Sequence, residues 1–213
     1  MIFHIVTLFP DIMQSYFSDS VIGVAVRNKK IQIKFYNPRD YTTDKHHKAD
    51  DRPYGGGPGM VMYAEPVLKA VAKARGKSQK KKFKIIILSP GGNYFTNTRA
   101  REYEKKYTDI ILICGRYEGI DARVEKILKA ELISIGDYVV TGGELPAMII
   151  VDAIARQIKG VLGKYESLEE ERISSHEVYT RPEVLIWKGK KHRTPDVLLS
   201  GNHKDIENWK KSL

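Results

Sequence analysis

The chain has 213 residues, which is enough for one large domain or for a main domain with a smaller partner. Apolar residues make up 42% of it, enough for a packed core, but no apolar run reaches the roughly 18 residues that a membrane-spanning helix needs. The single cysteine, Cys114, excludes an internal disulfide and a zinc site built from cysteines, so we expect a cytoplasmic protein without a membrane partner.

The net charge of +10 is unevenly distributed. Lysine and arginine outnumber aspartate and glutamate by 16 to 7 in residues 1–84, whereas the two types nearly balance in the rest. A basic run, KARGKSQKKKFK, ends this first part, and a smaller cluster, WKGKKHR, follows at 187–193. Either cluster alone is typical of solvated surface, but both together favour a polyanionic partner such as nucleic acid.

The first part of the chain is predicted as strand, helix, strand and a long loop. Residues 2–9 and 31–37 are rich in β-branched and aromatic side chains, which indicates strands, and we expect the first of them rather than a signal peptide to begin the chain. Residues 10–29 are predicted as a helix, with Pro10 suited to its first turn. Residues 37–60 form a polar segment with four glycines near its end, and loops this long are usually functional or disordered.

Farther along, helices alternate with short apolar runs. Strands are predicted at 84–89, 109–115 and 131–136, and helices at 64–75, 96–107, 120–129 and 144–158. Buried runs that alternate with helices indicate a parallel sheet with crossover connections, and hence an α/β fold. After Gly163 the sequence becomes polar and irregular until a short helix at 204–213, so we place a domain boundary near residue 163.

Glycine follows each of the three apolar runs, in SPGG (89–92), GRYEG (115–119) and GDYVVTGGELP (136–146). Ligands bind beyond the carboxyl ends of strands in open parallel sheets, so three glycine loops on neighbouring strand ends predict one ligand pocket. No phosphate-binding or dinucleotide-binding glycine motif is present. The loops carry Glu118, Asp137 and Glu144 against Arg116 alone, which suits a neutral or cationic ligand better than a triphosphate. Backbone amides and carbonyls of the loops can read a purine edge, which leaves a cofactor such as S-adenosylmethionine.

Six segments carry a resemblance to a known family: DDRPYGGGPGM, LSP, GRYEGID, SIGDYVVTGGELPAM, YTRPEV and LLSGNH, which extend in this order from Asp50 to His203. The chain resembles the bacterial tRNA (guanine-N1)-methyltransferases, the TrmD-type enzymes of the SPOUT superfamily. This resemblance implies methyl transfer from S-adenosylmethionine to N1 of guanosine 37 in tRNA, next to the anticodon, with S-adenosylhomocysteine as a product. It also suggests magnesium.

The same resemblance implies an architecture. Residues 1–163 would form an S-adenosylmethionine-binding α/β domain, whose SPOUT-type parallel sheet carries a trefoil knot at its C-terminal side. Residues 164–175 would be a linker, and 176–213 a small, mainly helical domain that binds tRNA. The protein would be a homodimer with its active site between the subunits.

Carried onto this sequence, the resemblance also assigns a cofactor site. Gly142 and Gly143 would let the backbone approach the cofactor, and Pro146 would fix the start of a helix. Ile120 and Val140 fit equally well as core side chains. The full cofactor set comprises Leu88, Ser89, Pro90, Gly115, Tyr117, Glu118, Gly119, Ile120, Ser134, Ile135, Gly136, Tyr138, Val140, Gly142, Gly143 and Pro146.

The chemistry requires a base for the N1 proton of guanine and a cation for the charge that develops on O6. Arg156 matches the arginine proposed for O6 in the family. The family has an aspartate as base, and Glu171 aligns with it, although a shorter linker leaves Glu169 and Glu170 open as alternatives.

Contacts to RNA are expected from five residues outside the cofactor set. Asp50 and Arg52 would touch the RNA or the partner subunit, and the second basic cluster would contribute Lys188, Lys190 and Lys191. His46 and His47, beside Asp50, are interpreted as a solvated loop rather than as a metal site.

Two other classes of function remain open from the sequence. A non-catalytic RNA-binding protein with the same fold would bind tRNA whether or not S-adenosylmethionine is present. A nucleotide-dependent oxidoreductase with an atypical doubly wound sheet would bind a dinucleotide instead.

Overall fold

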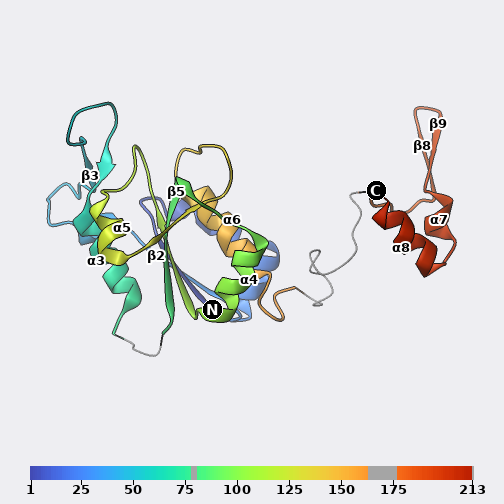
Figure 1. The fold of residues 1–213 in the computed structure, drawn as a ribbon, viewed down its shortest axis with the longest axis horizontal. Helices are drawn as coiled ribbons and strands as arrows, with labels where there is room; N and C mark the ends of the chain where they lie inside the picture. Colours follow the sequence, from blue (N-terminus) through green and yellow to red (C-terminus); the bar gives the residue numbers. More distant parts are fainter. Residues whose placement is uncertain (78–80, 163–176, 213) are drawn as a thin grey trace. The chain divides into compact units, whose positions relative to one another are not determined.

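The computed structural model describes residues 1–77, 81–162 and 177–212. The chain divides into two compact units, Met1–Gly163 and Lys164–Leu213, and each is described by itself (Figure 1).

The first unit is built on one parallel sheet of five strands in the order β2-β1-β6-β5-β7. The central strand β6, of sequence DIILIC, is buried at every residue because helices cover both faces of the sheet. The predicted α/β fold with parallel strands is therefore confirmed. The strands are β1 (Ile2–Val6), β2 (Gln32–Tyr36), β5 (Phe83–Tyr94), β6 (Asp109–Cys114) and β7 (Glu131–Ser134).

Alternate residues of β6 enter two separate cores. Ile110 and Leu112 pack into one core with side chains of α1, α2, α4 and α6, whereas Ile111 and Ile113 pack into the other with side chains of α3 and α5. The result is three layers, helices on a sheet on helices (Figure 1). The helices are α1 (Asp11–Ser18), α2 (Ser20–Arg27), α3 (Ala64–Arg75), α4 (Asn97–Lys106), α5 (Arg123–Leu128) and α6 (Glu144–Ala155).

The helix predicted over 10–29 is wrong in one respect, because the segment forms two helices. Asp19 is extended and Ser20 has a φ of +54°, which interrupts the helical backbone. The Asp19 side chain accepts a hydrogen bond from the Ser20 N–H and begins α2. Pro10 directly precedes α1, as its fixed φ favours.

The SPGG segment lies within a strand rather than in a loop after it. In β5, Leu88 and Asn93 both pair with Ile133, so residues 89–92 form a bulge and the strand resumes beyond them. A side chain at Gly92 would place its Cβ 2.5 Å from the Ile133 nitrogen, which explains the glycine at the point of closest approach.

The long segment 37–60 contains short structured elements that the sequence pattern did not predict. It includes a 3-10 helix, η1 (Pro38–Tyr41), and a two-residue strand, β3 (Asp50–Asp51). β3 pairs in antiparallel fashion with β4 (Val61–Met62), so the glycines between them close a hairpin-like loop.

The described part of the second unit comprises a hairpin and two helices. β8 (Val184–Trp187) and β9 (Lys190–Arg193) pair in antiparallel fashion, followed by α7 (Asp196–Leu199) and α8 (His203–Lys211). The sequence predicted α8 but missed the hairpin. Its two-residue turn has positive φ at both Lys188 and Gly189, the conformation that matches strand twist in tight hairpins.

Candidate functional site

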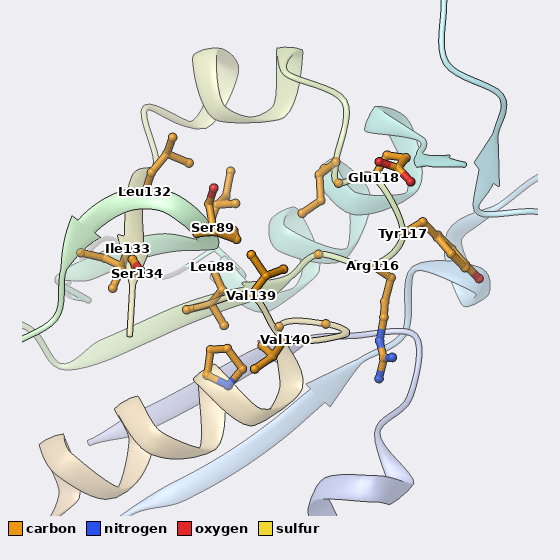
Figure 2. A pocket seen from close by; sticks show the side chains of 18 of the residues that line it. Leu88, Ser89, Arg116, Tyr117, Glu118, Leu132, Ile133, Ser134, Val139 and Val140 are labelled. Carbon is orange, nitrogen blue, oxygen red and sulfur yellow. The ribbon is translucent and has the colours of Figure 1, made fainter. Parts of the chain in front are cut away.

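A cavity of about 440 Å³ lies beside the bulge of β5 and beyond the carboxyl ends of β6 and β7 (Figure 2). Its walls come from residues 87–90, 115–122, 132–135 and 138–143, with Glu125 of α5 and Pro146 of α6. The structure therefore brings all three glycine segments to one cavity. Figure 2 shows Leu88, Val139 and Val140 gathered near its centre, while Arg116 and Tyr117 extend away from them.

All but one of the residues predicted to bind the cofactor line this cavity. The exception is Gly136, where an added Cβ would meet the Tyr138 ring at 2.3 Å, so this glycine makes room for a cavity side chain. The assignment from the sequence also missed several lining residues, because it took single positions from the family motifs rather than the whole loops that contain them. Asp121, within the motif GRYEGID, could have been included. The additional residues are Ile87, Arg116, Asp121, Ala122, Glu125, Leu132, Ile133, Val139 and Thr141.

Gly142 and Gly143 are required by contacts within the protein itself. The Gly143 N–H donates to the Gly115 carbonyl oxygen at 2.9 Å, and a Cβ on Gly143 would lie 2.5 Å from the Cys114 Cα. A Cβ on Gly142 would lie 2.4 Å from the Arg116 Nε. These two glycines therefore permit the close approach of one loop to another, and both also line the cavity. Their role in admitting a cofactor stays a prediction.

Glu144, at the first residue of α6, joins three parts of the site. It is 1% exposed, and its Oε1 accepts a hydrogen bond of 2.7 Å from the Thr7 hydroxyl at the end of β1. Its Oε2 lies 2.9 Å from the Arg116 Nε, an ion pair whose N–H is not aligned for a hydrogen bond. The Arg116 guanidinium also stacks on Phe9, 4.6 Å from the ring centroid. The contacts of Arg116 with Glu144 and with Phe9 thus hold residues 115–119 in place.

The ion pair between Arg116 and Glu144 changes the charge balance that the sequence predicted for the cavity. Glu144 does not line the cavity, and neither does Asp137; the carboxylates that do are Glu118, Asp121 and Glu125. Hydrogen bonds from Arg123 lower the pKa of Asp121 to about 2. Glu118 and Glu125 have no ion-pair partner among the described residues, so the cavity keeps an acidic edge that suits a positively charged ligand.

Arg156, the predicted catalytic cation, lines a different cavity. It lies just after α6 in a hollow of about 520 Å³ formed with the α1–α2 junction and Asp152. The Tyr16 hydroxyl donates to Asp152 there, and burial, followed by this hydrogen bond, raises the pKa of Tyr16 to about 12. Within a single subunit, Arg156 therefore does not line the cavity that was predicted to bind the cofactor. The predicted base, Glu171, and its alternatives, Glu169 and Glu170, lie outside the described residues.

The residues predicted to contact RNA lie in both units. Asp50 pairs with Met62 in the short β3–β4 ladder, and Arg52 follows it with an exposed side chain. Lys188 occupies the turn of the β8–β9 hairpin, with Lys190 and Lys191 on β9 and all three side chains exposed.

The described residues provide no site for the magnesium that the resemblance suggests. Across 1–77, 81–162 and 177–212, no three His, Cys, Asp or Glu side chains lie close enough to hold a metal ion. Within the same ranges, no helix is both long and apolar enough to span a membrane.

A parallel sheet with a glycine-lined cavity at its carboxyl edge is the arrangement in which α/β proteins form small-ligand sites. The chain belongs to the tRNA (guanine-1)-methyltransferase TrmD family, whose family model matches residues 1–213. The resemblance drawn from the motifs is thereby confirmed.

Three curated relatives, each named tRNA (guanine-N(1)-)-methyltransferase, illustrate the similarity. The protein of Dictyoglomus turgidum is 48% identical over 97% of this chain and 82% of its own length. That of Pseudoalteromonas atlantica is 45% identical over 98% of this chain and 78% of its own. That of Campylobacter jejuni is 42% identical over 100% of this chain and 92% of its own.

Gly143→Ala should weaken binding of S-adenosylmethionine roughly 10-fold or more, because the new methyl group must push the 142–143 backbone away from Cys114. Gly91→Ala is the matched control, since a Cβ there meets no atom within 4 Å. Isothermal titration calorimetry on the two folded variants measures the difference. Equal affinity in both would show that the cavity does not depend on this close approach.

Proposed function

We propose that this protein transfers a methyl group from S-adenosylmethionine to N1 of guanosine 37 in tRNA, next to the anticodon. The observation that carries the proposal is the family match over the whole chain, together with one cavity lined by the three glycine segments. The names of the relatives support a tRNA guanine as the acceptor. A tRNA substrate would place the protein in the cytoplasm.

The cavity fits S-adenosylmethionine in size, polarity and charge. Its volume of about 440 Å³ falls within the roughly 300–1,000 Å³ of small-molecule sites. Leu88, Ile133 and Val140 offer apolar surface for a purine ring, and the glycine loops expose backbone groups to its edge. Glu118 suits the positive groups. When bound, the cofactor supplies a methyl group that its sulfonium charge has already activated.

The protein would contribute a base, a cation and the position of the acceptor. We assign Glu171 as the base that takes the N1 proton, on the basis of its alignment in the family, with Glu169 and Glu170 as alternatives. Arg156 would stabilise the negative charge that builds on O6. Much of the rate would come from holding N1 in line with the methyl group.

The proposal includes the architecture of the family. Residues 134–146 would belong to a trefoil knot, and the contacts between Gly142–Gly143 and residues 114–116 support a fixed crossing of the two loops. Residues 1–163 would bind the cofactor, 164–175 would link, and 176–213 would bind tRNA. Lys188, Lys190 and Lys191 would neutralise phosphates, and Asp50 and Arg52 would contact the RNA or the partner subunit.

A homodimer would bring the separated parts of the site together. Leu145, Ile149, Asp152 and Arg156 follow one another along one stripe of α6, so Arg156 shares its face with two exposed apolar side chains. The Tyr16–Asp152 hydrogen bond places α1 beside this stripe. Exposed apolar side chains on neighbouring helices support an interaction site there. Exposed apolar residues on α1, α2 and α6 are Ile12, Tyr16, Val21, Val24, Leu145 and Ile149.

The direct test of the proposed function is methyl transfer from labelled S-adenosylmethionine to tRNA transcripts that carry G37 or A37. We expect label in the G37 transcript alone, at guanine N1. Binding of tRNA without transfer would favour a non-catalytic RNA-binding protein, and binding of a dinucleotide in place of S-adenosylmethionine would favour an oxidoreductase.

Ile149→Asp should convert the dimer to monomers and abolish most methyl transfer, because a buried carboxylate without a partner opposes association. Ile127→Asp on α5 is the control, since Ile127 is also helical and exposed, 62% against 47%, but lies outside the α1–α2–α6 face. Sedimentation equilibrium measures both variants. A wild-type protein that is monomeric and fully active at assay concentration would contradict the dimeric site.

Glu171→Gln should reduce single-turnover methyl transfer roughly 10²-fold or more and leave binding of S-adenosylmethionine and tRNA nearly unchanged, since an amide cannot accept the N1 proton. Glu171→Asp tests whether the longer side chain compensates for the shorter linker. Glu169→Gln and Glu170→Gln are the controls. Loss of transfer in one of these controls, with Glu171→Gln active, would reassign the base.

A further inference from the structure

The β8–β9 hairpin carries positive charge without a compensating acid. Residues 184–192 include Lys188, Lys190 and Lys191 and no aspartate or glutamate. Arg193, at the end of β9, is paired with Glu183 and Asp196, whereas the three lysines make no ion pair among the described residues. The tip of the hairpin is therefore a cationic surface available to an anionic partner.

The strand register separates the hairpin into two faces. Trp187 lies directly opposite Lys190, and Leu185 opposite His192, so these four side chains share one face. The other face carries the pairs Ile186–Lys191 and Val184–Arg193. One face thus combines an aromatic ring, a directly adjacent cation and an imidazole, whereas the other combines aliphatic side chains with cations.

The two tryptophans of the chain have different surroundings. Trp209, on α8, packs near the ring of Tyr179 with 6.3 Å between centroids. Trp187 is 63% exposed and has no aromatic neighbour among the described residues. The tight turn at Lys188–Gly189 and the hydrogen bond from the Thr194 N–H to the Glu183 carbonyl hold the hairpin at both ends. A large indole is thus presented to solvent on a short, closed element that projects beyond α7 and α8 (Figure 1).

We propose that the face formed by Leu185, Trp187, Lys190 and His192 binds an unpaired nucleotide of the tRNA substrate. The Trp187 indole stacks on the base, and Lys190 contacts the adjacent phosphate. This inference rests on the proposed function, which supplies tRNA as the partner. The positive charge beside Trp187 favours RNA rather than a protein as the partner, because surfaces that bind single-stranded nucleic acid interleave aromatic rings with cations.

Trp187→Ala in the full-length protein should weaken tRNA binding roughly 10-fold, as expected for loss of one base–aromatic stack. Trp187→Phe should retain most of the affinity, because a smaller aromatic ring still stacks. The matched control is Ile186→Ala, on the same strand with 64% exposure but on the opposite face, which should bind tRNA as the wild type does. Fluorescence anisotropy with labelled tRNA gives the affinities. Addition of tRNA should also quench tryptophan fluorescence in the wild type, and much less in Trp187→Phe.

The outcomes separate this inference from the proposed function. S-adenosylmethionine affinity should be equal in all four proteins, which shows that the first unit of each variant is folded, and wild-type tRNA affinity of Ile186→Ala shows that the hairpin tolerates a truncated side chain. If the wild type methylates G37 tRNA and Trp187→Ala binds it equally well, the hairpin inference is overturned and the proposed function stands. If the wild type binds tRNA without methylating it, the proposed function fails, and the Trp187→Ala affinity still decides the inference. A change in sedimentation without a change in tRNA affinity would make the face a protein contact and overturn it as well.

Discussion

The backbone of Gly143 packs directly on the backbone of Cys114 and Gly115, while Gly142 pairs with Arg116, and these contacts hold the 138–143 loop where it lines the cavity. A Cβ added at Gly143 would lie only 2.5 Å from the Cys114 Cα, so there is no space for any side chain. Because β6 is buried at every residue, the 114–115 end of the contact cannot move aside. The 138–143 loop therefore adopts its position against a buried strand end.

The buried pair of Glu144 and Arg116 extends this constraint to the first strand. An unpaired carboxylate at this depth would be costly, so Glu144 is held by the Thr7 hydroxyl on one oxygen and by Arg116 near the other. Its position at the first turn of α6 adds a favourable interaction with the helix dipole. Because Glu144 is paired with Arg116 and does not line the cavity, the acidic character of the cavity depends on Glu118 of the 115–122 loop and on Glu125 of α5.

Two other residues of the proposed mechanism are not among those that line the cavity. Arg156 is on the α6 stripe that also exposes Leu145 and Ile149, and the proposed RNA-stacking residue Trp187 is on a hairpin of the second unit. A methyltransferase that acts on a large RNA needs only the methyl donor in a deep pocket. The acceptor base must arrive from outside, so groups that act on it belong on surfaces that the RNA or a second subunit can reach.

The sequence by itself determined the α/β class, the parallel strands and the three glycine segments, since these depend on local composition: long apolar runs for strands buried on both faces, and glycines at their ends. Nearly all the residues that the family motifs assigned to the cofactor site line one cavity in the structure. Only the tertiary structure decided the break at Ser20, the bulge at 89–92, the pairing of Glu144 with Arg116 and the two faces of the β8–β9 hairpin. The bulge, the ion pair and the hairpin faces depend on strand register or on a contact between residues distant in sequence, whereas the break at Ser20 depends on the backbone conformation of one residue. None of these is encoded in the periodicity of a single segment.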